Sequence, residues 1–520
     1  MDITLLWLSA RSACVKIADG GLYSTMQAYT LRLNGKVRGE TNTVVFSLFD
    51  LLPNTSYLLE VVSDVDVLAQ LSFSTKDEFV TLNVRAFGAK GDGIHDDTQA
   101  IQAAILSCPE KSRVLIDAGR YLVSPLFLKS HLRLELEKGA CLLLHKDRAK
   151  SPVLPGLLQS WDEKDACNLG TWEGHPLDMF AALLNGIAVE DVEICGQGAM
   201  DGQAQLADWW QEPKKKRGGA WRGRMLFLNR CQSITIQGLS FCNSPSWNLH
   251  PYFSKSLRFL NVQVQAPADS PNTDGLNPDS CSDVLIAGAR FSLGDDCIAI
   301  KSGKLYMGLM YKTPCERVEI MHCLMEKGHG GVSIGSDMAG GVHDVLVHDC
   351  EMRDTDRALR IKTRRGRGSQ GRIDAIRFQR VRMENVAVPL VINSFYFCDP
   401  DGRSQYVQNR QSLPPDSRTP SIGAISLEDI EATGCQLAAA FLLGLPESKI
   451  GCVEIINARF SFAHTVVPAP PAMAEGVPDC ARCGIIAENV KTLMLRHVVF
   501  DGVQGDETMT FNVDSLIREE

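Results

Sequence analysis

The sequence lacks two features that define large classes of protein. It has no uninterrupted apolar run of about 18 residues, the length that a membrane-spanning helix needs. It also has no excess of basic residues, since 53 Lys and Arg stand against 62 Asp and Glu, for a formal net charge of −9. Because phosphate binding favours a basic domain, we expect neither a nucleic acid nor a membrane as a partner.

The 17 cysteines lack the spacing of a disulfide framework or a zinc site. The one Cys-x-x-Cys pair, Cys480 and Cys483, has no second pair and no histidine nearby. Others, such as Cys323 and Cys350, lie in apolar runs, where cysteine behaves as a small hydrophobic residue. This usage favours a reducing compartment, and we predict neither a bound metal nor a cofactor.

The N-terminus lacks the basic start of a secretion signal. Asp2 follows the first residue, and the apolar run after it is short and strand-like. We therefore expect a cytoplasmic protein, or a secreted or periplasmic one if the start site is misassigned.

After a predicted helix at about 98–106, helical periodicity is absent, and short alternating apolar motifs recur instead. Successive motifs lie 23 to 49 residues apart. Strand–turn–strand units of this length are typical of a parallel β-helix, in which longer steps place loops on one face. A TIM barrel or a Rossmann fold would need helices between the strands. The motifs begin at Val192, Ile234, Leu257, Val284, Val318, Val345, Ile376, Ile425, Val453 and Leu493.

Residues 1–78 have a different pattern, in which apolar residues alternate with period two between turns. This pattern indicates a small β-sandwich. Within it, the segment Leu52-Pro53-Asn54-Thr55-Ser56-Tyr57 resembles the tyrosine corner of fibronectin type III domains, in which the tyrosine hydroxyl bonds to nearby backbone. The predicted fold is therefore all-β, with a fibronectin type III-like β-sandwich over 1–78 and a parallel β-helix over 79–520.

Four polar segments fall on consecutive predicted coils of the β-helix. Coils stack about 4.8 Å apart, so equivalent positions meet although a whole coil of sequence separates them. We therefore expect three carboxylates, a histidine and two cations to share one surface. The segments are Asn272-Thr273-Asp274-Gly275, Gly294-Asp295-Asp296, Gly328-His329-Gly330-Gly331 and Arg360-Ile361-Lys362.

This set of side chains suits hydrolysis of a glycosidic bond by inversion. One carboxylic acid protonates the leaving oxygen while a carboxylate activates water on the opposite face, across a gap of about 6.5–9.5 Å. Adjacent Asp295 and Asp296 should raise each other's pKa, and a turn at Gly294 is needed to aim both at the site. Arg360 and Lys362 would project from one strand face to bind a sugar carboxylate. Each segment alone is more typical of a turn or a solvated loop, and their order along successive coils favours a site.

The motifs NTDG, GDDC, GHGG and RIKT, in this order, resemble those of glycoside hydrolase family 28, the polygalacturonases. The similarity extends over about residues 83–515 and includes the segments 84–93, 121–144 and 243–247. It implies a right-handed parallel β-helix that cleaves α-1,4-linked galacturonic acid in pectic poly- or oligosaccharides.

The same resemblance implies roles for individual residues. Asp295 would be the general acid, while Asp274 and Asp296 would activate the attacking water. His329 would lie beside the acid and support its proton state. The residues implied in substrate binding are Asn272, Arg360 and Lys362.

Three long predicted loops, at about 155–180, 204–224 and 396–421, narrow the subclass. Together with the fibronectin-like module they resemble bacterial exo-acting members of the family, in which extra loops close one end of the cleft. Such a wall would contact the terminus of the sugar chain. The candidates for this wall or for a sugar platform are Trp247, His250, Arg222, Arg224 and Tyr396.

Three alternatives stay open at this point. A rhamnogalacturonan or xylogalacturonan hydrolase would belong to the same family. A pectate lyase would share the β-helix, but it eliminates rather than hydrolyses and needs Ca²⁺ held by several carboxylates. A β-helical carbohydrate-binding protein without activity would have no use for an acidic pair beside a third aspartate.

Overall fold

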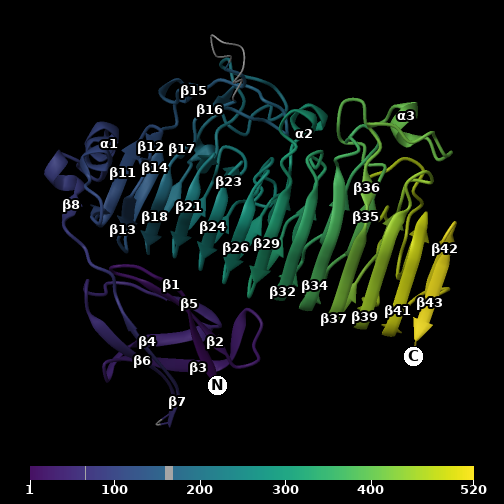
Figure 1. The fold of residues 1–520 in the computed structure, drawn as a ribbon, viewed down its shortest axis with the longest axis horizontal. Helices are drawn as coiled ribbons and strands as arrows, with labels where there is room; N and C mark the ends of the chain where they lie inside the picture. The colour runs from purple at the N-terminus through teal and green to yellow at the C-terminus, as the bar shows by residue number, and fades with distance from the viewer. Residues whose placement is uncertain (65, 159–167, 520) are drawn as a thin grey trace.

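The structure is a computed structural model that describes residues 1–64, 66–158 and 168–519. Figure 1 shows a small sandwich of strands β1–β7 and a long stack of coils that begins at β8 (Thr81–Asn83). One sheet of the sandwich has the order β1-β2-β5 and the other the order β4-β3-β6-β7. These strands are β1 (Asp2–Leu8), β2 (Ala13–Ala18), β3 (Ser24–Leu33), β4 (Lys36–Thr43), β5 (Val45–Leu48), β6 (Ser56–Ser63) and β7 (Asp66–Ser74).

The predicted tyrosine corner is present in the sandwich. The backbone N–H of Leu52 donates a hydrogen bond of 2.9 Å to the hydroxyl of Tyr57. Apolar residues from both sheets, among them Val15, Leu31 and Leu59, fill the space between them. The period-two alternation in the sequence arises because each strand buries one of its two faces in this core.

The stack of coils is a parallel β-helix. Its largest sheet runs along the whole stack, and successive coils pair in parallel. All ten predicted apolar motifs begin at one position of this ladder: Val192 pairs with Ile234, Ile234 with Leu257, and the series continues to Leu493. The strands that contain them are β18 (Glu190–Gly196), β21 (Gln232–Gln237), β24 (Lys255–Leu260), β26 (Ser282–Ala287), β29 (Cys315–Met321), β32 (Val342–Arg353), β34 (Arg372–Glu384), β37 (Ala424–Cys435), β39 (Ile450–Phe462) and β41 (Val490–Asp501).

A second parallel ladder contains the coils on which the site was predicted. It has two runs of strands, β12-β17-β20-β23 and β28-β31-β33-β35-β38-β40-β42. Leu276 joins the runs, because it pairs with Leu249 on one side and with Ile298 on the other. The strands are β12 (Leu126–Phe127), β17 (Leu184–Ile187), β20 (Leu226–Asn229), β23 (Leu249–Tyr252), β28 (Ile298–Ile300), β31 (Val332–Ile334), β33 (Arg357–Lys362), β35 (Val388–Asn393), β38 (Ala438–Leu443), β40 (Cys483–Glu488) and β42 (Thr508–Phe511).

The predicted helix at 98–106 is α1 (Thr98–Ser107), which covers the N-terminal end of the stack. Its residues Ile101 and Ile105 are buried in the apolar interior of the coils. Two short helices, α2 (Leu305–Tyr311) and α3 (Gln405–Gln408), lie among the long loops. Of the three predicted loops, the first contains residues 159–167, which lie outside the described residues.

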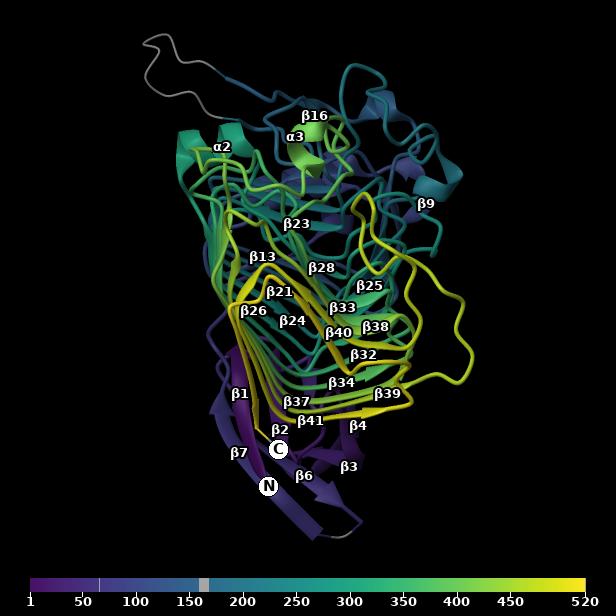
Figure 2. The same ribbon diagram turned by 90° about the vertical axis from the view of Figure 1, so that its right-hand side faces the viewer.

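The sandwich packs on the outer face of the large sheet. Val45 of the sandwich contacts an apolar cluster that includes Leu260, Ala287 and Met321. Gly288 (φ +64°) allows this approach, because a Cβ at that position would lie 2.5 Å from the Cβ of Val45. Figures 1 and 2 both place the sandwich on one side of the stack and the long loops with α2 and α3 on the opposite side. The sandwich therefore leaves the loop side uncovered.

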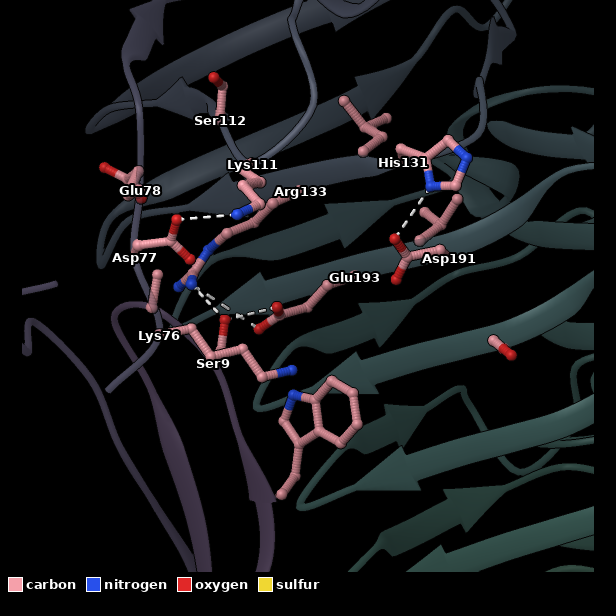
Figure 3. A pocket seen from close by; sticks show the side chains of 15 residues that line it. Ser9, Lys76, Asp77, Glu78, Lys111, Ser112, His131, Arg133, Asp191 and Glu193 are labelled. Atoms are coloured by element: carbon pink, nitrogen blue, oxygen red, sulfur yellow. Dashed lines mark hydrogen bonds and ion pairs between the residues drawn. The ribbon is translucent and has the colours of Figure 1, made fainter. Parts of the chain in front are cut away.

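A polar network beside this apolar contact also joins the two parts (Figure 3). Arg133 of β13 (Leu132–Leu136) donates hydrogen bonds to the hydroxyl of Ser9 and, at 3.1 Å, to Glu135. Ser9 donates in turn to Glu193 at 2.5 Å. A cavity of about 230 Å³ remains next to this network. Arg133 and Glu135 are both buried, and Glu135 compensates the charge of Arg133 while it also pairs with Arg113 at 2.8 Å.

Two further findings concern the described residues as a whole. None of the 16 cysteines for which the structure gives coordinates forms a disulfide, and Cys167 lies outside the described residues. Within the same ranges, every helix is too short or too polar to cross a lipid bilayer.

We expect the substitution Arg133→Met to lower the free energy of unfolding by about 2–3 kcal/mol, because it leaves buried acidic groups with less compensation. The control is Arg317→Met, since the ion pair between Arg317 and Asp283 (2.7 Å) is half exposed and should contribute less than about 1 kcal/mol. Urea unfolding of both variants beside the parent protein measures the difference. Equal shifts of the two midpoints would contradict the structural role of Arg133.

Candidate active site

The register of the second ladder brings the predicted acidic residues together. Leu276 and Ile298 pair on adjacent coils, so Asp274 and Asp296, each two residues earlier, are also neighbours. One carboxylate oxygen from each of Asp274, Asp295 and Asp296 lies within 4.8 Å of the other two. The three carboxylates thus share one place on the surface of the stack, as the coil spacing predicts.

The turn that aims the acidic pair follows β27 (Arg290–Leu293) and precedes β28. Within this turn the backbone N–H of Asp296 donates a hydrogen bond of 2.9 Å to the carboxylate of Asp295. Gly294 is required because two segments approach closely there. A Cβ at Gly294 would lie 2.7 Å from the carbonyl oxygen of Pro267 and 2.8 Å from that of Ser270. The predicted turn is present, although its glycine serves this close approach rather than a left-handed backbone.

Asp296 is buried and ionised. Its two oxygens accept hydrogen bonds from Arg360 (3.2 Å) and Lys362 (2.7 Å), which project together from β33 as predicted. Burial by itself would raise the pKa of Asp296. The adjacent Lys362 ammonium and Arg360 guanidinium outweigh that effect and lower the pKa below its ordinary value.

Asp274 is also buried, but its pKa shifts in the opposite direction. Burial, together with repulsion from Asp295, raises the pKa of Asp274 to about 7. Asn277 donates a hydrogen bond of 2.8 Å to this carboxyl, and the ammonium of Lys301 lies 3.9 Å away. The sequence pointed to the adjacent Asp295–Asp296 pair for a raised pKa. In the structure the pKa of Asp274 is raised, whereas that of Asp296 is lowered because two cations neutralise it. The cluster therefore combines a proton held near neutrality with an ionised carboxylate, as acid–base catalysis requires.

His329 lies at the entrance to the site. Its backbone N–H donates a hydrogen bond of 3.3 Å to the carbonyl of Asp295, and its Nδ1 lies 2.8 Å from the carboxylate of Asp356. The contact with Asp356, helped by the charge of Asp295 and opposed by partial burial, raises the pKa of the His329 imidazole. Asp356 was not identified from the sequence, where nothing marks it as the partner of His329.

Two cavities meet at the carboxylates. The larger one, of about 650 Å³, is termed the open-side cavity, and the smaller one, of about 110 Å³, the wall-side cavity. Asp295 lines both cavities. An extended ligand that occupies the two cavities at once would therefore pass beside its carboxyl group. Residues that line only the open-side cavity include His329, Asp356, Arg357, Arg360 and Met473. Residues that line only the wall-side cavity include Glu173, Trp247, Asp274, Asp296, Lys301, Lys304, Asp337 and Asp399. Both are lined by Lys214, Asn272, Lys362, Tyr396 and Cys398.

Residues 168–178, termed the wall loop, border the wall-side cavity through Glu173. The loop packs on the stack through Gly174, whose carbonyl accepts a hydrogen bond of 3.0 Å from the backbone N–H of Lys304. Gly174 adopts a φ of +74°, and a Cβ there would lie 2.8 Å from the Lys304 nitrogen and 3.0 Å from the Cβ of Asp337. This close contact presents Glu173 to the cavity.

Arg222 and Arg224 support the wall loop from behind. Trp172 of the loop stacks on Trp221 with 4.8 Å between ring centroids, and the two guanidinium groups lie 5.2 and 4.9 Å from the centre of the Trp172 ring. Both arginines, which were candidates for the wall or a sugar platform, are buried and line neither cavity, so they lie behind the wall loop and not at the surface of the cleft. Arg222 also donates a hydrogen bond of 2.7 Å to the side chain of Asn272 and so fixes that residue at the cleft.

His250 is likewise placed away from the cleft. It is fully buried on β23 beside Trp247, with 4.9 Å between the two rings, so it cannot contact a sugar directly. Trp247 does line the wall-side cavity, and Tyr396 lines both cavities, as expected for candidate sugar contacts. The ammonium of Lys362 lies 5.7 Å from the centre of the Tyr396 ring.

Several cleft residues were missed by the sequence analysis. Lys301 pairs with Asp279 of the preceding coil in the same ladder that aligns Asp274 with Asp296, so the register could have located it. Lys304 lies 2.9 Å from Asp399. Asp399 belongs to a long loop, and no periodicity in the sequence indicates that this loop returns to the cleft.

Comparison with known proteins agrees with this geometry. The model of glycosyl hydrolases family 28 matches residues 164–410, and a model described as rhamnogalacturonase A/epimerase, pectate lyase-like, matches residues 81–134. An endo-polygalacturonase of Pectobacterium parmentieri is 30% identical over 313 residues, which are 58% of this chain and 72% of that protein. A probable polygalacturonase of Vitis vinifera is 29% identical over 391 residues, which are 74% of this chain and 75% of that protein. The chain belongs to glycosyl hydrolases family 28, and it is accordingly a glycoside hydrolase.

Solved structures show the same fold. The family 28 exopolygalacturonase of Yersinia enterocolitica has a TM-score of 0.72 at 18% identity, with 98% of each chain covered. An exopolygalacturonase of Thermotoga maritima has a TM-score of 0.64 at 24% identity, with 82% of this chain and 93% of that one covered. The likeness to the Yersinia protein therefore includes the N-terminal sandwich as well as the β-helix.

The pKa values of the two buried aspartates shift in opposite directions, so replacing each by asparagine should have opposite effects on stability. The pKa of Asp274 is raised on folding, so its ionisation costs stability above about pH 7 and costs nothing below about pH 4, where it is protonated in both states. We expect Asp274→Asn to stabilise the protein by roughly 2 kcal/mol at about pH 8 and to have little effect at about pH 4.

The matched variant Asp296→Asn should destabilise the protein at about pH 8, because it leaves Arg360 and Lys362 buried without their acceptor. Unfolding midpoints of both amides at the two pH values measure the difference. A loss of stability in both variants at the higher pH would contradict the assigned charge states.

Proposed function

We propose that the protein hydrolyses α-1,4-galacturonosyl linkages of polygalacturonate or oligogalacturonides and releases short products from a chain end. One observation supports this function above all. Three carboxylates, of which Asp274 has a raised and Asp296 a lowered pKa, lie where two cavities meet, beside two buried cations that project from one strand. The names of the relatives, polygalacturonases of plants and bacteria, support the same substrate class.

In this proposal Asp295 protonates the leaving oxygen. It is the carboxyl that faces both cavities, so a scissile bond that passes from one to the other lies within its reach. Because the carboxyls interact, the proton retained near neutrality belongs to the cluster as a whole. His329 lies on the open side of Asp295, and its contact with Asp356 fixes its imidazole there. In this position it supports the protonated form of Asp295.

Asp274 and Asp296 then activate the attacking water. The distance between the carboxylates is shorter than the gap predicted for an inverting pair, since the closest oxygens lie within 4.8 Å. Inversion remains our proposal because each oxygen of Asp296 already accepts a bond from a cation, which makes Asp296 a poor nucleophile. When the proton of the cluster lies on Asp295, Asp274 and Asp296 are both ionised, and a water held between them can lose its proton to either carboxylate.

The substrate is a pectic polymer or oligomer, because its carboxylates complement the cleft. Arg360 and Lys362 are each 6% exposed, and a carboxylate that reaches them in this buried setting is held by strong charge-assisted bonds. A neutral polysaccharide would leave these cations without a partner other than Asp296.

Attack from a chain end is supported by the wall loop. Gly174 packs against Lys304 and Asp337 beside the wall-side cavity, whose volume of about 110 Å³ leaves room for only a short extension of the sugar chain beyond the carboxylates. The open-side cavity is several times larger and accommodates the remainder of the chain.

We further propose that residues 1–78 form a fibronectin type III-like domain and residues 79–520 the catalytic domain. The strand orders of the two sheets of the sandwich support this division.

We also propose that the enzyme acts in the cytoplasm on imported oligomers. The free cysteines of the described residues support this location. Fractionation of the source cells tests the location, and activity confined to the medium or the periplasm would contradict it.

Time-resolved product analysis on polygalacturonate tests the substrate and the mode of attack. We expect monomer or dimer from the first minutes, because the wall limits how far the chain passes the carboxylates. A ladder of intermediate lengths would instead indicate internal cleavage. An unsaturated, ultraviolet-absorbing product would identify a lyase and refute hydrolysis.

We expect Asp295→Asn to lower kcat by more than about 1,000-fold, because the amide cannot supply the proton that the leaving oxygen needs. Binding of an oligogalacturonide, measured by calorimetry, should change by less than about tenfold, since Arg360 and Lys362 are intact. Turnover at the parent rate would rule out Asp295 as the acid.

A further inference from the structure

The cations that line the cleft differ in what they already bind. Lys362 lies 2.7 Å from Asp296, and Lys304 lies 2.9 Å from Asp399, so each has a carboxylate partner at hydrogen-bond distance. Lys301, which lines only the wall-side cavity, has no such partner among the described residues. Its nearest carboxylate oxygen, on Asp274, is 3.9 Å away.

Lys301 is nevertheless held firmly in place. Only 5% of the residue is exposed, and its ammonium lies 4.6 Å from the centre of the Trp247 ring. Trp247 is in turn supported by Arg224, whose guanidinium is also 4.6 Å from that centre. Burial lowers the pKa of Lys301, but Asp274, Asp337 and other carboxylates nearby outweigh it and raise the pKa, so the ammonium stays charged.

A purely local role for this charge does not fit the geometry. If Lys301 served only to neutralise Asp274, a contact as short as that between Lys362 and Asp296 would be expected, and the pKa of Asp274 would be low. The contact is 3.9 Å instead, and the pKa of Asp274 is about 7. A buried ammonium that lines a cavity and has no carboxylate at hydrogen-bond distance among the described residues is suited to bind an anion there.

We propose that Lys301 binds the carboxylate of the terminal galacturonate that the enzyme releases. This inference rests on the proposed function and adds to it a determinant of substrate choice. Arg360 and Lys362 lie on the open side of Asp295 or beside it, whereas Lys301 lies on the wall side. Cleavage then requires a carboxylate on both sugars that flank the scissile bond. A rhamnose in the wall-side cavity offers no carboxylate, so this residue selects against rhamnogalacturonan.

The test compares two trimers, trigalacturonate and the same trimer methyl-esterified only on the residue that is released. For the parent enzyme we expect kcat/KM to be about 100-fold lower on the ester, because the ammonium loses its charged partner. For Lys301→Met we expect a loss of about 100-fold on the acid and little change on the ester, so that the preference disappears. Lys301→Arg keeps a cation and should retain part of the preference.

The control is Lys214→Met, which removes another cleft lysine, one that pairs with Glu173 at 3.1 Å and is largely exposed. We expect this variant to keep the full preference for the acid. If Lys301 acted only through the charge state or position of Asp274, Lys301→Met would slow both trimers by the same factor and the preference would survive, which overturns the proposal.

The parent enzyme provides a test that does not depend on the folding of any variant. Equal kcat/KM on the two trimers would overturn the role of Lys301 while leaving the proposed hydrolase function intact. Failure to cleave trigalacturonate at all would instead refute the proposed function itself.

Discussion

The in-register stacking of parallel coils is the constraint on which the active site depends. Backbone hydrogen bonds align Leu249, Leu276 and Ile298, and this alignment alone makes neighbours of Asp274 and Asp296, which are a full coil apart in the chain. A slip of one residue in any of these coils would turn a carboxylate into the apolar interior. The ladder that stabilises the fold therefore also fixes the distances on which the chemistry relies.

Charge balance explains how so many ionisable groups remain buried at one place. Arg360 and Lys362 share Asp296, while burial raises the pKa of Asp274 to about 7, so the cluster retains a proton near neutrality. Groups of this kind are costly to bury, and the expected gain in stability on removing the Asp274 carboxyl measures part of that cost. The wall loop requires two more buried charges, because Trp172 of this loop packs against the guanidinium groups of Arg222 and Arg224.

The sequence predicts the coils and the acidic cluster well, because both depend on position within a repeating unit. All ten motifs occupy one ladder, and the order of the polar segments identifies the coils that hold the carboxylates. It predicts poorly which of the equivalent positions line the cleft. Arg224, Trp247 and Asp274 occupy the same position on successive coils, yet Arg224 is buried and Asp274 lines a cavity.

The difference arises from the wall loop, whose Trp172 covers Arg222 and Arg224. Where a long loop folds back is decided by contacts such as that between Gly174 and Lys304, which no period in the sequence reveals. The same limit applies to His250, whose position on its coil matches that of Asn277 but which the aromatic cluster conceals. Lys301, by contrast, was open to prediction, because its place in the ladder follows from the same register as the aspartates.

The central claim is that Asp274 and Asp296 direct a water, rather than a side chain, to the anomeric carbon. The anomeric configuration of the first product, followed by proton NMR before mutarotation, tests it most directly. Because the cleaved linkage is α, attack by water predicts a β-configured product at early times. An α-configured initial product would show retention and would contradict the account, since it would make one of these aspartates the nucleophile.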